Sequence, residues 1–168
     1  MKGLQNKVVI VTGGAGGIGS ATCRRLAEEG AKVAIFDMNL TVAEQLASEI
    51  QAQGGQALAV QCDITQSDVV EQAVQLTEEK LGAIDGLVNN AGWDVFKPFV
   101  KSTPEEWQKL IQINLVGMLN MHFTVLKGMV ARNSGSIVNI ASDAARVGSS
   151  GEAVYAACKG GLLSFSKT

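Results

Sequence analysis

The chain has few of the residues on which several common catalytic sites depend. Its only histidine, His122, lies in the apolar-rich stretch 115–126, where we interpret it as a helix-surface or interface residue rather than a base. This argues against a hydrolase of the Ser-His-Asp type. The three cysteines, Cys23, Cys62 and Cys158, form no CxxC pair and lie near no histidine in the sequence. Neither a metal site nor a thiol-redox motif is indicated, and we expect reduced cysteines in the core or at helix contacts.

Long hydrophobic runs and a strong charge of one sign are also missing. The apolar runs are short, such as 8–11, whereas a membrane-spanning helix needs roughly 20 apolar residues. The first residues are not followed by a secretory hydrophobic region. A formal net charge of -2 with 18% charged residues gives no reason to expect a polyanion partner. We therefore expect a cytoplasmic protein with no membrane or nucleic-acid partner.

What the sequence does contain is an alternation of short β-branched runs and longer amphipathic segments. The strands are predicted at 8–11, 32–36, 57–61, 86–88 and 136–140, and the helices at 17–29, 41–53, 67–80, 104–130 and from about 151 onward. Strands separated by helices of this length form right-handed parallel crossovers. The prediction is an α/β protein with a doubly wound parallel sheet and helices on both faces. At 168 residues, a single domain over 1–168 is expected.

A glycine-rich turn follows the first predicted strand and opens the first predicted helix. Gly14, Gly16 and Gly19 form a GxGxxG pattern. Such a turn lets backbone N–H groups approach a pyrophosphate, which the amino end of the helix also attracts. Glycine-rich turns also serve close packing, so the pattern alone leaves both interpretations open.

Asp37 follows the second predicted strand, near the spacing at which a dinucleotide-binding domain places an acidic residue for a ribose diol. A carboxylate accepts hydrogen bonds from the 2′- and 3′-hydroxyls and repels a 2′-phosphate. The neighbours Met38 and Asn39 are uncharged, and the glycine turn contains no Arg or Lys. NAD is therefore favoured over NADP. The alternative is that Asp37 is a solvated residue that enters a turn.

Three polar residues near the end of the chain fit proton transfer to and from a carbonyl oxygen. Tyr155 and Lys159 are spaced i and i+4, on one helix face, and Ser142 follows the fifth predicted strand. A free phenol has a pKa of about 10. A cation about 4 Å away supplies on the order of 4 kcal/mol at an effective dielectric near 20, enough to lower that pKa by about three units. A YxxxK pattern alone is more often an exposed helix face, and only the combination indicates a site.

These motifs together resemble the short-chain dehydrogenase/reductase family, of the type called classical. The segment 12–19 resembles its TGxxxGIG turn, 89–92 its NNAG motif, and 155–159 its YxxxK motif. The resemblance covers the whole chain and implies a Rossmann fold with NAD(P)-dependent redox chemistry on a CH–OH group. It also implies a homodimer or homotetramer.

The resemblance assigns roles residue by residue. Ser142 positions the substrate oxygen, Tyr155 is the acid/base, and Lys159 lowers the phenol pKa and binds the nicotinamide ribose. Asn114 is implied to hold a water in the proton path, although an amide there can also cap or bend a helix. The cofactor is expected to contact Gly13, Gly16, Gly17, Ile18, Asp37, Met38, Asp63, Ile64, Asn90, Ala91, Gly92, Tyr155 and Lys159.

Two segments, 90–99 and 141–148, bear a closer likeness to a dehydrogenase that oxidises a ring alcohol β to an acyl-CoA thioester; related members reduce 3-oxoacyl carriers. Trp93, Phe96 and Val147 are candidates for an apolar wall against the ring. Arg146 is a candidate cation for a carboxylate or a CoA phosphate. Loop packing or a surface charge explains each of these four residues equally well.

The end of the chain departs from the family pattern. It stops at 168, inside the last predicted helix, whereas typical members continue through two more strands and a helical lid. We therefore expect a truncated domain, and the rival hypothesis is a catalytically silent dinucleotide-binding module with an open pocket.

Overall fold

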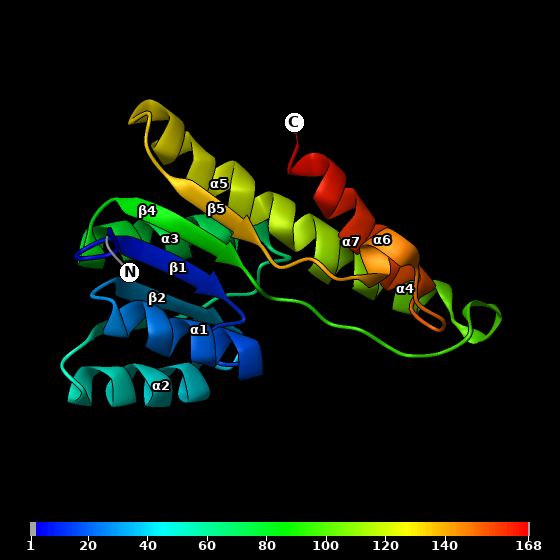
Figure 1. The fold of residues 1–168 in the computed structure, drawn as a ribbon, viewed down its shortest axis with the longest axis horizontal. Helices are drawn as coiled ribbons and strands as arrows, with labels where there is room; N and C mark the ends of the chain where they lie inside the picture. The colour runs from blue at the N-terminus through cyan, green and yellow to red at the C-terminus, as the bar shows by residue number, and fades with distance from the viewer. Residues whose placement is uncertain (1–2, 168) are drawn as a thin grey trace.

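Five parallel strands form the centre of the part of the chain that the computed structural model describes, residues 3–167 (Figure 1). They are β1 (Val8–Thr12), β2 (Lys32–Asp37), β3 (Gln56–Gln61), β4 (Ile84–Asn89) and β5 (Ser136–Asn139). Their order in the sheet is β3-β2-β1-β4-β5. The order reverses between β1 and β4, and the crevice at the carboxyl ends of strands at such a reversal is where open α/β sheets bind ligands.

Helices cover both faces of this sheet. They are α1 (Gly17–Glu28), α2 (Leu40–Ala52), α3 (Ser67–Leu81), α4 (Pro104–Ile111), α5 (Gly117–Ala131), α6 (Ala144–Val147) and α7 (Ala153–Phe165), with a 3₁₀ turn at Phe99–Lys101. In Figure 1, α1 and α2 lie on one face, and α3 and α5 on the other. The predicted fold class, a doubly wound Rossmann arrangement, is confirmed.

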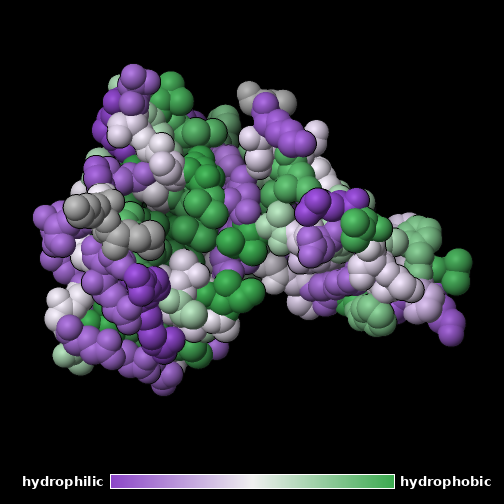
Figure 2. All heavy atoms as spheres, viewed as in Figure 1, coloured by the Kyte–Doolittle hydropathy of each residue, from purple (hydrophilic) through white to green (hydrophobic). Residues whose placement is uncertain are grey.

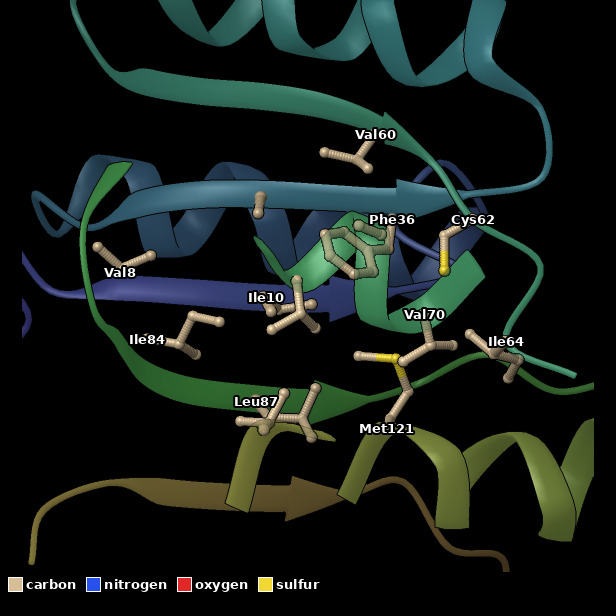
Figure 3. Close-up of a cluster of buried hydrophobic side chains, with 14 of the residues drawn as sticks. Val8, Ile10, Phe36, Val60, Cys62, Ile64, Val70, Ile84, Leu87 and Met121 are labelled. Carbon is tan, nitrogen blue, oxygen red and sulfur yellow. The ribbon is translucent and has the colours of Figure 1, made fainter. Parts of the chain in front are cut away.

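Alternate residues of the strands enter two separate cores. Ile10 and Phe36 point toward α3 and α5, where they meet Val70 and Met121 (Figure 3). Val11 and its neighbours on β2 point the other way, into the core between the sheet and helices α1 and α2. All of β1 is buried as a result, as is typical of a parallel strand covered on both faces. The central strands therefore form a rigid support for the loops at their carboxyl ends.

Two sequence-based expectations were wrong in this region. The helix predicted over 104–130 is interrupted, because α4 ends at Ile111 and a π-helical turn, Gln112–Val116, precedes α5. His122 is not a surface residue, since only 5% of it is exposed. Its Nδ1 lies 2.9 Å from the Met118 carbonyl oxygen, and its ring meets the edge of Phe165 with centroids 5.0 Å apart. The packing of α5 between β4 and α7 buries this face of the helix.

One part of the sheet is less covered than the rest. Figure 2 shows apolar surface between α1 and the region of β5, and Val138 on β5 is 52% exposed. A cleft of about 340 Å³ lies there, lined by Leu26, Val88 and Val138 among others. No helix in the described part of the chain has the length and apolar character to cross a membrane.

Candidate active site

The glycine turn between β1 and α1 is built so closely that side chains do not fit. Gly13 has a φ of 60°, and a Cβ there would lie 2.9 Å from the Ala91 Cα atom. A Cβ on Gly19 would overlap the carbonyl oxygen of Gly13. Within residues 3–167 no side chain caps the amino end of α1, where Gly16 occupies the cap position. A helix end with free N–H groups beside a turn of bare backbone fits a pyrophosphate.

The NNAG segment fastens the end of β4 to this turn. The Asn90 side-chain Nδ2 donates to the carbonyl oxygens of Thr12 and Gly13, at 3.0 and 3.1 Å. The Thr12 hydroxyl in turn accepts from the backbone N–H groups of Asn90 and Ala91, both at 3.1 Å. These bonds hold Asn90, Ala91 and the glycine turn in one fixed arrangement.

Asp37 lies at the end of β2 and faces the turn. Its Oδ2 accepts from the Ala15 N–H at 3.0 Å, and its Oδ1 accepts from the Asn39 N–H, also at 3.0 Å. Each carboxylate oxygen has further capacity to accept hydrogen bonds, so the same group can hold a ribose diol. Asp37 is therefore a support of the turn as well as a candidate ligand of the cofactor.

Asp63, which follows β3, likewise supports its own loop and is a candidate ligand of the cofactor. Its Oδ1 accepts from the Thr65 N–H at 2.9 Å and from the Thr65 hydroxyl at 2.7 Å, and its Oδ2 accepts from Gln66 at 3.1 Å. Burial alone would raise the pKa of Asp63, but these hydrogen bonds outweigh it and the pKa is lowered. The side chain is thus held as a carboxylate.

The predicted cofactor residues, apart from Tyr155 and Lys159, line one cleft with a volume of about 710 Å³. It is lined by Gly13, Gly16, Gly17, Ile18, Gly19, Asp37, Met38, Cys62, Asp63, Ile64, Thr65, Asn90, Ala91, Gly92, Trp93, Lys109 and Ile113. Bare glycine backbone, an uncapped helix end and two carboxylates at the edges fit a dinucleotide laid along the carboxyl ends of the strands.

Lys159 is buried and aimed at the loop after β5. Only 3% of it is exposed, and its ammonium donates to the Ile140 carbonyl oxygen at 2.8 Å. The same nitrogen lies 5.6 Å from the centroid of the Tyr155 ring, one turn earlier on α7. A Cβ on Gly92 would be 3.7 Å from it, so the ammonium stands between the tyrosine and the cofactor cleft. Burial lowers the pKa of Lys159.

Ser142 lies close enough to Tyr155 for its hydroxyl to act on the ionisation of the phenol. The Ser142 hydroxyl also accepts from the Ala144 N–H at 3.2 Å, which fixes it at the start of α6. The pKa of Tyr155 is raised, first by burial and then by the carboxylates of Asp94 and Glu152, while Ser142 lowers it. This is the opposite of the direction expected from Lys159, because burial and the two carboxylates outweigh the effect of Ser142.

Asn114 explains the interruption of the predicted long helix. It lies in the π-turn, is 1% exposed, and its Nδ2 donates to the Leu110 and Trp93 carbonyl oxygens at 3.0 and 2.7 Å. Its Oδ1 accepts from the Trp93 N–H at 3.3 Å and would lie 3.0 Å from a Cβ on Gly92. π-Turns of this kind are frequent at functional sites, and this one places a polar amide beside Gly92 and Lys159.

The four residues suggested for substrate contact do not gather at one point. Trp93 lines the cofactor cleft, and the Lys109 ammonium lies over its ring, 4.0 Å from the centroid. Phe96 and Val147 are 75% and 82% exposed. Arg146 is exposed and lies 3.9 Å from Asp143. They form no closed wall in the described residues.

Sequence reasoning missed two carboxylates. Asp94 and Glu152 line a small cavity together with Tyr155. Asp94 comes directly after the NNAG motif and Trp93, and Glu152 precedes α7 by one residue. Their closeness to two recognised motifs was the available signal, but only the fold brings the two loops together.

Comparison with known proteins agrees with this geometry. The profile of a family described as short chain dehydrogenase matches residues 7–168. The chain is 40% identical over 169 residues to a 3-oxoacyl-[acyl-carrier-protein] reductase of Synechocystis sp., covering 100% of this chain and 68% of the relative. It is 38% identical over 164 residues to a cyclopentanol dehydrogenase of Comamonas sp., covering 98% of this chain and 66% of that protein.

A solved structure shares the fold. The crystal structure of an NAD+-bound xylitol dehydrogenase superposes with a TM-score of 0.94 at 34% identity, covering 98% of this chain and 64% of that one. The chain thus spans about two thirds of the length of these relatives. It belongs to the short-chain dehydrogenase family, and the relatives named above are oxidoreductases that act on CH–OH groups or on the corresponding carbonyls.

Proposed function

We propose that the protein is an NAD-dependent oxidoreductase that interconverts a secondary alcohol and a ketone. The observation that carries this proposal is the placement of three side chains at the edge of the cofactor cleft. The Ser142 hydroxyl acts on the ionisation of the Tyr155 phenol, and the Lys159 ammonium lies 5.6 Å from the centroid of the Tyr155 ring and close to Gly92. A reacting oxygen that binds to both hydroxyls would lie beside that cleft.

The chemistry follows from these contacts. The glycine turn and Asp37 would hold NAD, whose chemistry would be to take up a hydride from the carbinol carbon and, when reduced, to supply it to the ketone. Ser142 orients the substrate oxygen, and Tyr155 accepts the hydroxyl proton as the carbon loses its hydride and the carbonyl forms. In the reverse direction Tyr155 donates that proton to the oxygen. The charge of Lys159 favours the phenolate over the phenol, opposing the burial that favours the phenol. The side-chain amide of Asn114 supplies a polar group for the proton path between Lys159 and the π-turn.

NAD is preferred over NADP in this proposal. Asp37 is held as a hydrogen-bond acceptor at the end of β2, and its neighbours in the cleft are Met38 and the glycine turn. A 2′-phosphate would meet a carboxylate there. The superposed xylitol dehydrogenase is bound to NAD+, which supports the same choice.

The substrate class that we propose is a 3-hydroxyacyl thioester, with 2-hydroxycyclohexanecarboxyl-CoA as the particular candidate. The segments 90–99 and 141–148 resemble a dehydrogenase of that substrate, and Trp93 lines the cofactor cleft. The similarity to the 3-oxoacyl reductase of Synechocystis sp. favours a second candidate, a 3-oxoacyl carrier as substrate. Both are β-oxygenated thioesters and require the same proton transfer at Tyr155.

Spectrophotometric assays of the full-length protein test the proposal. We expect NADH to form from NAD and a cyclic 3-hydroxyacyl-CoA, and Ser142→Ala to lower the rate by about a hundredfold, the size of a typical acid/base contribution. A Ser164→Ala variant, on the exposed end of α7, is the matched control and should leave the rate unchanged. NAD binding by calorimetry without turnover of any hydroxyacyl or oxoacyl thioester would instead establish a silent dinucleotide-binding module.

We also propose that the chain forms a cytoplasmic homo-oligomer from single-domain subunits. Phe123 and Val130 on α5 are 66% and 73% exposed, and an apolar cleft lies between Ile111 and Val154. Such apolar surface on adjacent helices suits a contact with a second copy. Light scattering of the full-length protein should give the mass of a dimer or tetramer, and a monomer would contradict this.

A further inference from the structure

Two carboxyl groups lie beside the candidate acid/base, and the proposed proton transfer does not use them. Asp94 follows β4 and Glu152 precedes α7, and both line one small cavity with Tyr155. The two loops are fastened together by the Lys97 N–H, which donates to the Gly151 carbonyl oxygen at 3.0 Å. The Asp94 Oδ1 accepts from the Val95 N–H at 2.7 Å. These bonds fix the carboxyl groups in place.

The two side chains lie close enough that each shifts the pKa of the other. Burial and the neighbouring Glu152 raise the pKa of Asp94, while bonds to Ser149 and Asp94 lower the pKa of Glu152. The two acids therefore place negative charge beside Tyr155, and both raise the pKa of its phenol.

The charges that line this cavity do not balance. Among the described residues that line it, Lys97 is the only cation, and its ammonium is paired with Glu106 at 2.5 Å. Lys109 lies over the Trp93 ring. The Lys159 ammonium, 5.6 Å from the centroid of the Tyr155 ring, is directed to the Ile140 carbonyl oxygen and does not line the cavity. The wall of the cavity therefore has a net negative charge.

We infer that Asp94 and Glu152 are specificity-determining residues, which exclude substrates with a free carboxylate next to the reacting carbon and admit neutral esters and thioesters. The inference rests on the proposed function. In a 3-oxo or 3-hydroxy acid only one carbon separates the reacting carbon from the carboxyl carbon. An oxygen bound at Tyr155 and Ser142 therefore brings a free carboxylate close to the pair, where like charges repel strongly in a partly buried site. Esterification removes this repulsion.

A matched pair of ketones tests the inference with the full-length protein and NADH. Ethyl acetoacetate and the acetoacetate anion present the same ketone and differ in charge. The wild type should reduce the ester with a kcat/KM at least about tenfold higher, the difference lying in KM. Asp94→Asn combined with Glu152→Gln keeps the shape of both side chains and removes their charge. It should raise the ratio of the kcat/KM for the anion to that for the ester about tenfold. The ratio is the readout because loss of the two charges also alters the pKa of Tyr155, which acts on both ketones.

The matched control is Asp143→Asn, the same change at a side chain that is 92% exposed. It should not alter the ratio of ester to anion, because solvent screens its charge. Equal use of both ketones by the wild type, or an unchanged ratio in the double variant, would overturn the inference and leave the proposed function standing. Failure to reduce any ketone or thioester would count against the proposed function itself.

Discussion

Replacement of Asp37 by Asn separates the charge of this residue from its role in the glycine turn. The amide keeps one oxygen that can accept from the Ala15 N–H, a bond of 3.0 Å in the wild type, and it is almost the same size. It loses the negative charge that would hold two ribose hydroxyls. Hydrogen bonds to a charged group contribute about 1 kcal/mol more each than those to a neutral group, so NAD should bind more weakly by about 2 kcal/mol, or roughly thirtyfold.

NADP should respond in the opposite direction. A carboxylate about 5 Å from a phosphate charge repels it by about 3 kcal/mol at an effective dielectric of 20, before screening by salt. Loss of that repulsion together with the weaker hold on NAD should reduce the preference for NAD at least about a hundredfold. Calorimetric dissociation constants for NAD and NADP measure the change, and Asp68→Asn on α3 serves as the control. A preference that moves by less than about threefold would refute the assignment of Asp37.

Three further predictions concern the lysine, the turn and the thiols. In Lys159→Met, the rise of the alcohol-oxidation rate with pH should shift to higher pH, because loss of a positive charge raises the pKa of the neighbouring phenol. A pH–rate profile that does not shift at saturating NAD would mean that the lysine does not act on Tyr155. Gly19→Ala should abolish NAD binding and lower the melting temperature, since its Cβ would overlap the Gly13 carbonyl oxygen; binding by calorimetry as tight as in the wild type would contradict the close packing of the turn. Burial raises the pKa of Cys23 and Cys62 to about 12, so iodoacetamide should label neither thiol in the native protein at neutral pH and both after unfolding; rapid labelling of the native protein, followed by mass spectrometry, would contradict their burial.

Much of the fold follows from local sequence signals. The predicted strand at 32–36 is observed as Lys32–Asp37, and the helix predicted at 67–80 as Ser67–Leu81. The strand is a short apolar run and the helix an amphipathic segment. Parallel pairing follows from the alternation of strands and helices along the chain. The three cysteines are buried and free, as the absence of a CxxC pair led us to expect.

What could not be predicted depends on contacts between distant segments. The π-turn arises because the Asn114 side chain bonds to the Trp93 backbone, 21 residues earlier, and no local pattern in 104–130 contains that information. His122 is buried by Phe165, again a contact made by the fold. The raised pKa of Tyr155 depends first on burial and then on Asp94 and Glu152, which the fold brings beside it. The residue spacing predicted that Lys159 would act on Tyr155, but it did not predict Asp94 and Glu152.

The central claim is that the Tyr155 hydroxyl carries the proton in a site that binds NAD independently of that hydroxyl. Single-turnover hydride transfer in Tyr155→Phe, measured alongside the NAD dissociation constant, tests it most directly. We expect the transfer rate to fall by at least about a thousandfold while NAD affinity changes by less than about threefold. Hydride transfer at a rate close to that of the wild type, with NAD bound, would contradict the account.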